Sequence, residues 1–241
     1  MQASHPWRGD SAVFDEDNLV SHAGLVPLLE LAERAWLSAL LDEHVRFTSE
    51  RVKSGAANPT PTHGHTRQLS TVLRRHLVTL ADQTRVLAGV GERAFIDIDS
   101  LLRPVYGHAK QGASFGHTKI AGKTILRRGL SPLAVTICTP TAAPVLAGVR
   151  LRAGRAGSAK GAASMLTEAI NTAKDAGATA PNILVRGDSA FCSGKVVAAV
   201  VKAGATFSFA IARNPAVDAA IAKIGDEQYT PARSPIPTPA N

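Results

Sequence analysis

Three aspartates have the residue type and spacing of metal-binding carboxylates. Asp97 and Asp99 alternate with isoleucines, so they share one face of a predicted strand and lie about 7 Å apart. Two like charges on one face repel each other unless something lies between them, which favours a bound cation. Asp188 ends a later apolar strand, although an Asp followed by Ser also fits a plain turn or helix cap.

These aspartates suggest a magnesium site if their strands are neighbours. Asp99 and Asp188 would then meet at one end of the sheet, with Asp97 as a further ligand. Carboxylate oxygens are ligands that Mg²⁺ prefers. Two such ions about 3.5–4 Å apart can activate a water or a 3′-hydroxyl and stabilise the leaving oxygen. This chemistry suits phosphodiester cleavage and strand transfer.

The positive charge is concentrated in one segment. The net charge is +8, but residues 100–167 contain ten Lys or Arg and no acid. Such a segment favours a polyanion such as DNA, although a solvated face of an alkaline protein is the competing interpretation. The predicted DNA-binding residues are Arg103, Lys110, Lys119, Lys123, Arg127, Arg128, Arg150, Arg152, Arg155 and Lys160.

Hydrophobic periodicity predicts an α/β fold preceded by a helical region. Helices are expected over residues 20–45, 66–87, 158–176 and 193–203, and strands over 94–99, 133–139, 145–151, 182–185 and 207–212. A linker at 53–65 and a glycine-rich basic connection at 103–122 separate them. Three antiparallel strands followed by two αβ units form the mixed sheet of the ribonuclease-H-like fold, a name attached here by analogy.

Other features exclude several classes of protein. Cys138 and Cys192 stand far apart, which argues against a disulfide framework or a thiolate zinc site and fits the cytoplasm. The polar start of the chain predicts no signal peptide. The charge-free run 129–149 is long enough to cross a membrane, but its three prolines favour two strands joined by a turn.

Several motifs resemble one family. Phe95-Ile-Asp-Ile-Asp-Ser with Arg103-Pro-Val-Tyr-Gly-His, and Val185-Arg-Gly-Asp-Ser-Ala-Phe, are similar to the first two catalytic blocks of DDE transposases of bacterial insertion sequences. The nearer resemblance is to the branch called DDE domain group 1. Val20-Ser-His-Ala-Gly-Leu-Val-Pro is similar to the amino-terminal helix of that family. The resemblance extends from about Asp15 to Thr230.

This resemblance implies metal-dependent DNA cleavage and strand transfer at element ends by a ribonuclease-H-like core with two Mg²⁺ or Mn²⁺ ions. The first family acid falls on Asp99, with Asp97 as second choice, and the second falls on Asp188. The third is a Glu on a late helix, for which no match is found; Glu227 lies in a stretch that resembles the insertion region. The implied partners are transposon-end and target DNA, with a homodimer on DNA, no membrane, and a place in the bacterial cytoplasm at the nucleoid.

The resemblance divides the chain into three parts. We expect a helical, possible DNA-binding region at 1–91, shortened near 60–62, an incomplete catalytic core at 92–228, and a disordered proline-rich tail at 229–241. The shortening and the early end lead to the hypothesis of a truncated or inactive copy. The alternatives are a non-catalytic DNA-binding protein or inhibitor derived from a transposase, and an unstable fragment with no role.

Overall fold

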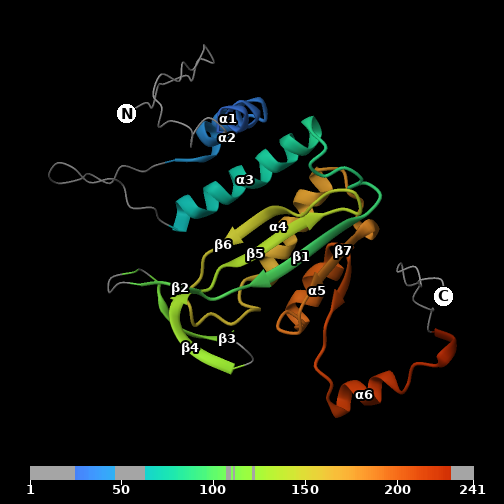
Figure 1. Cartoon of the computed structure of the whole chain (residues 1–241). Coiled ribbons are helices and arrows are strands. Elements are labelled where there is room, and N and C mark those ends of the chain that lie inside the picture. Colours follow the sequence, from blue (N-terminus) through green and yellow to red (C-terminus); the bar gives the residue numbers. More distant parts are fainter. Residues whose placement is uncertain (1–24, 47–62, 107–109, 111, 121–122, 229–241) are drawn as a thin grey trace, which may run out of the picture.

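The protein is built around a five-stranded mixed sheet that carries helices on one face. A computed structural model describes residues 25–46, 63–106, 110, 112–120 and 123–228. The strand order is β6–β5–β1–β7–β8 (Figure 1), and the bounds are β1 (Ala94–Ser100), β5 (Leu133–Cys138), β6 (Val145–Arg150), β7 (Ile183–Gly187) and β8 (Thr206–Phe209). β5 runs antiparallel to β1 and β6, β7 runs parallel to β1, and β8 runs parallel to β7. The predicted mixed α/β class is confirmed, and this order is compatible with a ribonuclease-H-like sheet.

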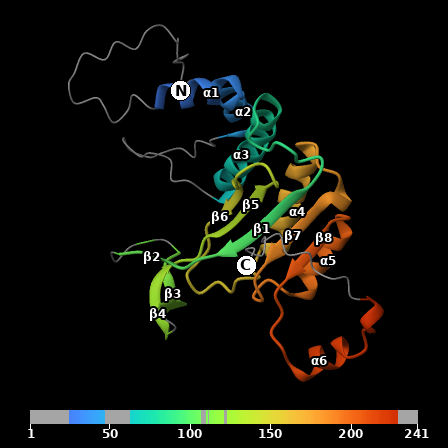
Figure 2. The same ribbon diagram turned by 45° about the vertical axis from the view of Figure 1, so that its right-hand side comes forward.

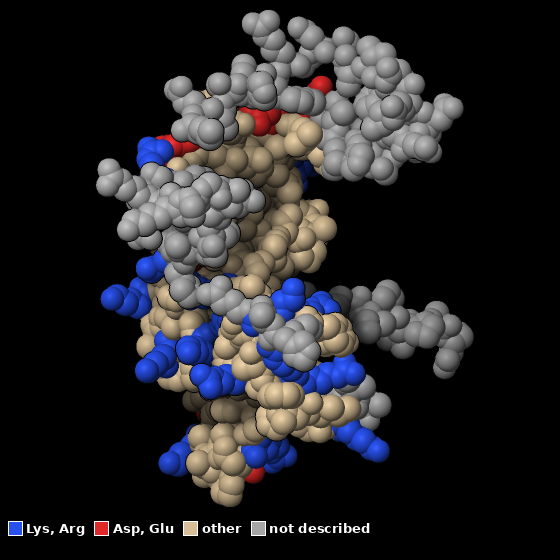
Figure 3. Space-filling model, turned by 90° about the vertical axis from the view of Figure 1, so that its left-hand side faces the viewer, with Lys and Arg blue, Asp and Glu red and all other residues tan. Residues whose placement is uncertain are grey.

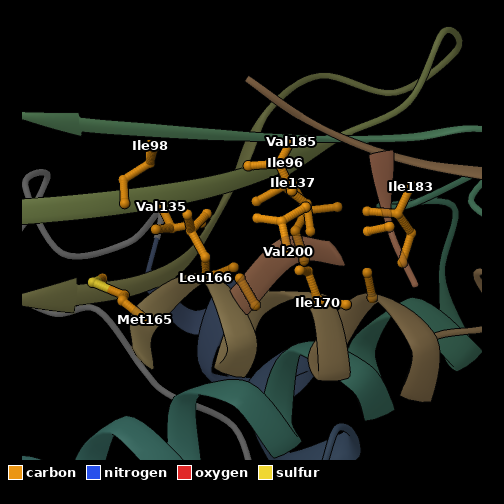
Figure 4. Packing of buried hydrophobic residues seen from close by; sticks show 14 of the residues in the cluster. Ile96, Ile98, Val135, Ile137, Met165, Leu166, Ile170, Ile183, Val185 and Val200 are labelled. Carbon is orange, nitrogen blue, oxygen red and sulfur yellow. The ribbon is translucent and has the colours of Figure 1, made fainter. Parts of the chain in front are cut away.

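Alternation along the strands decides which face is buried. Ile96 and Ile98 of β1, Val135 and Ile137 of β5 and Val185 of β7 are almost completely buried, whereas the residues between them are more exposed. Their side chains point toward the helices, where the labelled residues Leu166 and Ile170 of α4 (Ala162–Asp175) and Val200 of α5 (Gly194–Lys202) meet them (Figure 4). Each fully buried aliphatic side chain contributes about 1.5–3 kcal/mol to folding, so this layer anchors the strands that carry the aspartates.

The helices differ from the expected ones mainly at their ends. The bounds are α1 (Leu25–Arg34), α2 (Leu37–His44), α3 (His63–Gln83), α4 (Ala162–Asp175), α5 (Gly194–Lys202) and α6 (Pro215–Ile221). The continuous helix expected over 20–45 is wrong, because Trp36 adopts a left-handed conformation (φ 66°) that separates α1 from α2. Helix α3 begins within the expected linker. Ser193 precedes α5, but its side chain makes no capping hydrogen bond.

A second, three-stranded sheet replaces the connection expected over 103–122. It has the order β2–β4–β3, with β2 (Arg103–Pro104), β3 (Ser114–Ile120) and β4 (Lys123–Leu130). It projects beyond the end of the five-stranded sheet (Figures 1 and 2). The predicted glycine-rich connection did not anticipate these strands. Few of the described side chains of β3 and β4 are buried, so the hydrophobic pattern does not alternate as that of a half-buried strand does.

The C-terminal part of the described chain adds a short helix that the sequence reading missed. Asn214 caps α6 by accepting hydrogen bonds from the backbone N–H groups of Ala216 and Val217, and Pro215 occupies the first turn. This combination of cap and proline is a recognisable helix start. Helix α6 lies apart from the sheet and its helices in both views of the ribbon (Figures 1 and 2).

The charge-free run 129–149 forms part of the two sheets. It contains the end of β4, all of β5 and most of β6, joined by the turn at Thr139–Pro140–Thr141. Among the described residues, no helix has the length and apolar character needed to cross a membrane. Several expectations fall outside the described residues, namely the N-terminal segment, the shortening near 60–62 and the tail at 229–241.

Candidate active site

Two strands bring the candidate acids to one edge of the sheet. β1 and β7 are parallel neighbours, and their register places Ile98 opposite Gly187. The next residue on each chain is Asp99 or Asp188, so both follow at the carboxyl end of the strand pair. Adjacent strands lie about 4.8 Å apart. Two residues separated by 89 positions in the sequence therefore become neighbours, and both are exposed to solvent.

Each of these carboxylates makes one local hydrogen bond. The backbone N–H of Ser100 donates to Asp99 Oδ1 at 2.6 Å, and the N–H of Ala190 donates to Asp188 Oδ1 at 2.9 Å. The second contact is the turn that an Asp followed by Ser favours. Within the described part of the chain, neither carboxylate forms an ion pair. The second oxygen of each exposed carboxylate therefore makes no hydrogen bond to the described residues.

Asp97 has a different environment. Arg186 of β7 donates two hydrogen bonds to it, Nε to Oδ1 and a terminal nitrogen to Oδ2, both at 2.7 Å. The guanidinium also stacks over the ring of Phe95, 4.5 Å from its centroid. Such a paired, bidentate contact is among the stronger protein hydrogen bonds. The structure thus gives Asp97 an arginine partner.

The ion pair also affects the neighbouring titratable groups. The hydrogen bonds from Arg186 to Asp97 raise the pKa of the guanidinium. Cys138 of β5 lies beside the pair, with its Sγ 3.9 Å from Asp97 Oδ2. Burial and then the charge of Asp97 raise the pKa of this thiol. Cys138 is therefore a protonated, buried thiol at neutral pH.

Asp99 and Asp188 lie at the carboxyl end of β1 and β7, and the described residues contain no larger cluster of metal-binding side chains. No group of three or more His, Cys, Asp or Glu side chains among them is arranged to hold a metal ion. Glu227 lies in a short 3-10 helix (Asp226–Gln228) that follows α6. The third carboxylate of the family pattern is thus not found in the described part of the chain.

Two of the ten predicted DNA-binding cations serve the fold. Arg152 is only 9% exposed, and its guanidinium donates to the carbonyl oxygens of Ser131, Gly157, Ser158 and Lys160. Burial, and then the nearby Arg150, lower its pKa. Arg150 itself bridges to Glu168 of α4 at 3.3 Å. Sequence alone does not separate these two arginines from exposed ones.

The remaining cations lie mainly at the surface. Six have exposed side chains, namely Arg103, Lys110, Lys123, Arg127, Arg155 and Lys160. Arg128 is half-buried and has an interaction partner, and the side chain of Lys119 lies outside the described residues. Lys and Arg gather on the middle and lower part of the face in Figure 3, whereas the acidic residues visible there lie mainly along its upper edge.

Sequence reasoning missed Arg186 as a partner within the site. The signal was present, because Arg186 lies two residues before Asp188 and therefore faces the same side of the sheet. Identifying its partner additionally required the register that sets Asp97 opposite Arg186. Along β1 and β7, the Asp97–Arg186 pair lies two residues before Asp99 and Asp188.

Comparison with known proteins agrees with the motif resemblance. The family model described as transposase DDE domain group 1 matches residues 66–235, which is well over half of the chain. Neither the curated proteins nor the solved structures contain a match. The matched range contains both exposed aspartates and the complete five-stranded sheet. The chain therefore belongs to the transposase DDE domain group 1 family.

Proposed function

We propose that this chain contains a ribonuclease-H-like core of a bacterial insertion-sequence transposase, in which Asp99 and Asp188 bind divalent metal for DNA cleavage and strand transfer. The observation that carries the proposal is the shared edge of β1 and β7, where both exposed aspartates follow paired strands. Family membership supports transposition and DNA binding as the general role. A bacterial cytoplasmic location at the nucleoid and a homodimer on DNA belong to the same proposal.

The donor set at this edge fits Mg²⁺ or Mn²⁺. Two carboxylates supply oxygen ligands, and each retains an oxygen that makes no hydrogen bond to the described residues. Bound there, such an ion would activate a water or a 3′-hydroxyl and stabilise the leaving oxygen. Asp97 is left out of the proposed ligand set because Arg186 already compensates its charge.

The other residues have supporting roles in this proposal. The buried layer beneath β1 and β7 holds the two acids on rigid strands, which reduces the ordering needed at the moment of reaction. The exposed cations of the basic segment bind the phosphates of DNA close to the acids. Arg150 and Arg152 are left out of the DNA surface because they contact the protein itself.

Metal binding by the full chain tests the two aspartates. Titration with Mn²⁺, followed by electron paramagnetic resonance, should show binding that weakens at least tenfold in Asp99→Asn and in Asp188→Asn. Residues that only orient metal ligands already change affinity by about 10–100-fold. Asp82→Asn, on the exposed surface of α3, is the matched control and should bind like wild type. Equal binding by all three variants would remove both aspartates from the proposed site.

A second candidate is a DNA-binding protein that does not cleave. It is favoured by the presence of only two edge acids in the described part of the chain. Incubation with Mg²⁺ or Mn²⁺ and DNA carrying the ends of the element distinguishes the two candidates. Cleavage at the ends that is lost in Asp188→Asn supports the transposase. DNA binding with no cleavage in either metal supports the non-catalytic protein.

A further inference from the structure

The hairpin formed by β3 and β4 has two unlike faces. Cross-strand partners share a face, and the register pairs Phe115 with Arg128 and His117 with Leu126. We call this the outer face of the hairpin. The inner face contains Gly116 and Gly129, which lie against the backbone of Gly154 so closely that an added Cβ on Gly116 or Gly154 would overlap carbonyl oxygens. The inner face therefore attaches the hairpin to the body of the protein.

The outer face presents apolar side chains to solvent. Phe115 is 60% exposed and Leu126 is 56% exposed, although each comes from a regular strand. Tyr106, which follows β2, is 82% exposed. Burying such side chains is favourable, so their exposure on a regular strand forgoes a stabilising contribution. Neighbouring exposed apolar side chains are a feature of surfaces that bind a partner.

The charge around this face indicates what the partner is. Arg103 of β2 is exposed and pairs with Leu130, which places it on the outer face, whereas the exposed Lys123 and Arg127 of β4 alternate to the opposite face. Residues 100–167 contain no acid. Apolar side chains beside an exposed cation, in a segment without acids, fit a polyanion whose charges alternate with apolar faces, as the phosphates and bases of a nucleic acid do.

The hairpin also lies close to the candidate acids along the chain. β1 ends at Ser100 and β2 begins at Arg103, while β4 leads into β5 through Ser131 and Pro132. The backbone N–H of Leu101 donates to the carbonyl of Pro132, which joins the two connections at the base of the hairpin. The hairpin thus extends from the end of β1 that carries Asp99, so DNA placed at the acids would run past it.

We propose that the outer face of the hairpin contacts DNA bases directly, with Phe115 and Leu126 as an apolar wedge that unstacks a base step beside the cleavage site. Arg103, on the same face, binds an adjacent phosphate. The proposal rests on the proposed function, because it takes DNA as the substrate. Apolar wedges of Phe or Leu are able to open base steps, and the cost is lowest where the bases are already unpaired.

The test measures DNA binding by the full chain over a range of salt concentrations. The probes are a fully paired duplex and one with a central mismatch, each carrying 2-aminopurine at the central step. Wild type should prefer the mismatched duplex and increase the 2-aminopurine fluorescence on binding. Phe115→Ala and Leu126→Ala should each weaken binding about fivefold or more and remove the fluorescence increase. Their salt dependence should stay the same, because no phosphate contact is lost.

Two matched variants separate the wedge from general DNA binding. Arg103→Gln should lower the slope of log K against log salt by about 1 while keeping the fluorescence increase. Phe207→Ala changes an exposed phenylalanine on β8 and should bind like wild type. Thermal unfolding and circular dichroism of each variant establish that the fold is intact.

Three results would overturn the wedge. If Phe115→Ala and Leu126→Ala bind and unstack DNA as wild type does, the wedge is wrong while DNA binding and the proposed function stand. If wild type binds neither duplex, both proposals fail. Sedimentation with vesicles of phosphatidylserine and phosphatidylcholine tests a lipid partner, and loss of vesicle binding in the two variants with unchanged DNA binding would assign the outer face to a membrane surface instead.

Discussion

The five-stranded and three-stranded sheets are continuous along the chain but are stabilised in different ways. The larger sheet buries a complete apolar layer against α4 and α5. The smaller sheet is attached through backbone contacts at glycines and leaves the side chains of Phe115 and Leu126 exposed. The comparison teaches that the larger sheet is suited to hold residues in fixed positions, whereas the smaller one is suited to present side chains to a partner.

The same contrast separates the two kinds of charged residue. On the five-stranded sheet, Asp97 is paired with Arg186 and Arg150 is paired with Glu168. On the three-stranded sheet, Arg103, Lys123 and Arg127 are exposed. Charges in the first group stabilise contacts between elements, and charges in the second remain available to a polyanion.

Truncating an apolar side chain in each sheet region should produce the largest difference. Leu166→Ala, in the fully buried layer of α4, should lower the free energy of unfolding by about 2–5 kcal/mol, because it leaves a cavity. Leu126→Ala on the hairpin should change it by no more than about 0.5 kcal/mol. Urea denaturation of both variants provides the measurement. Equal losses would show that the hairpin is packed into a core after all.

Arg152 and Arg155 test whether the charges that stabilise the fold are distinct from those available to a polyanion. Arg152→Met should lower the free energy of unfolding by about 1.5–3 kcal/mol, because several carbonyl groups lose a charged donor. Arg155→Met removes an exposed cation and should leave stability within about 0.5 kcal/mol of wild type. It should instead lower the salt dependence of DNA binding by a slope of about 1. If the two variants have the same free energy of unfolding, the separation of Arg152 from the exposed cations is wrong.

Adding one methyl group tests how the hairpin is attached. Gly154→Ala places a Cβ against the carbonyl oxygens of Ser114 and Gly129, so the loop or the hairpin must move. We expect a loss of about 1–3 kcal/mol, the usual cost of overpacking. Hydrogen exchange should increase in β3 and β4 and stay unchanged in β1 and β7. Gly157→Ala, where an added Cβ meets no atom within 4 Å, is the control. Uniform loss of protection in both sheets would contradict separate attachment.

The smallest expected effect concerns pH. Burial and Asp97 raise the pKa of Cys138, so the folded protein retains this thiol proton to higher pH than the unfolded chain does. The resulting stability is present below the ordinary thiol pKa of about 8.5 and is lost as pH rises through the folded value. Between pH 7 and 10, wild type should therefore lose more stability than Cys138→Ala in urea denaturation. Cys192→Ala serves as the control, and an identical pH dependence in all three proteins would be the contrary result.

Elements with a regular hydrophobic period could be predicted from the residues alone. The alternation around Asp97 and Asp99 predicted β1, the 3.6-residue stripe predicted α4, and the apolar run before Asp188 predicted β7. These predictions succeeded because burial of one face leaves a regular pattern in the chain. The hairpin of β3 and β4 was missed for the same reason, since its side chains remain exposed and leave no such pattern.

The contacts between charged groups, in contrast, became known only from the folded arrangement of the chain. Asp97 and Asp99 are equivalent in sequence, yet cross-strand register places Arg186 against one of them and leaves the other at the exposed edge. Arg152 and Arg155 likewise look alike until the fold surrounds one of them with carbonyl groups. The physical reason is that electrostatic partners are set by distance in space, and here the partners Asp97 and Arg186 are 89 residues apart along the chain.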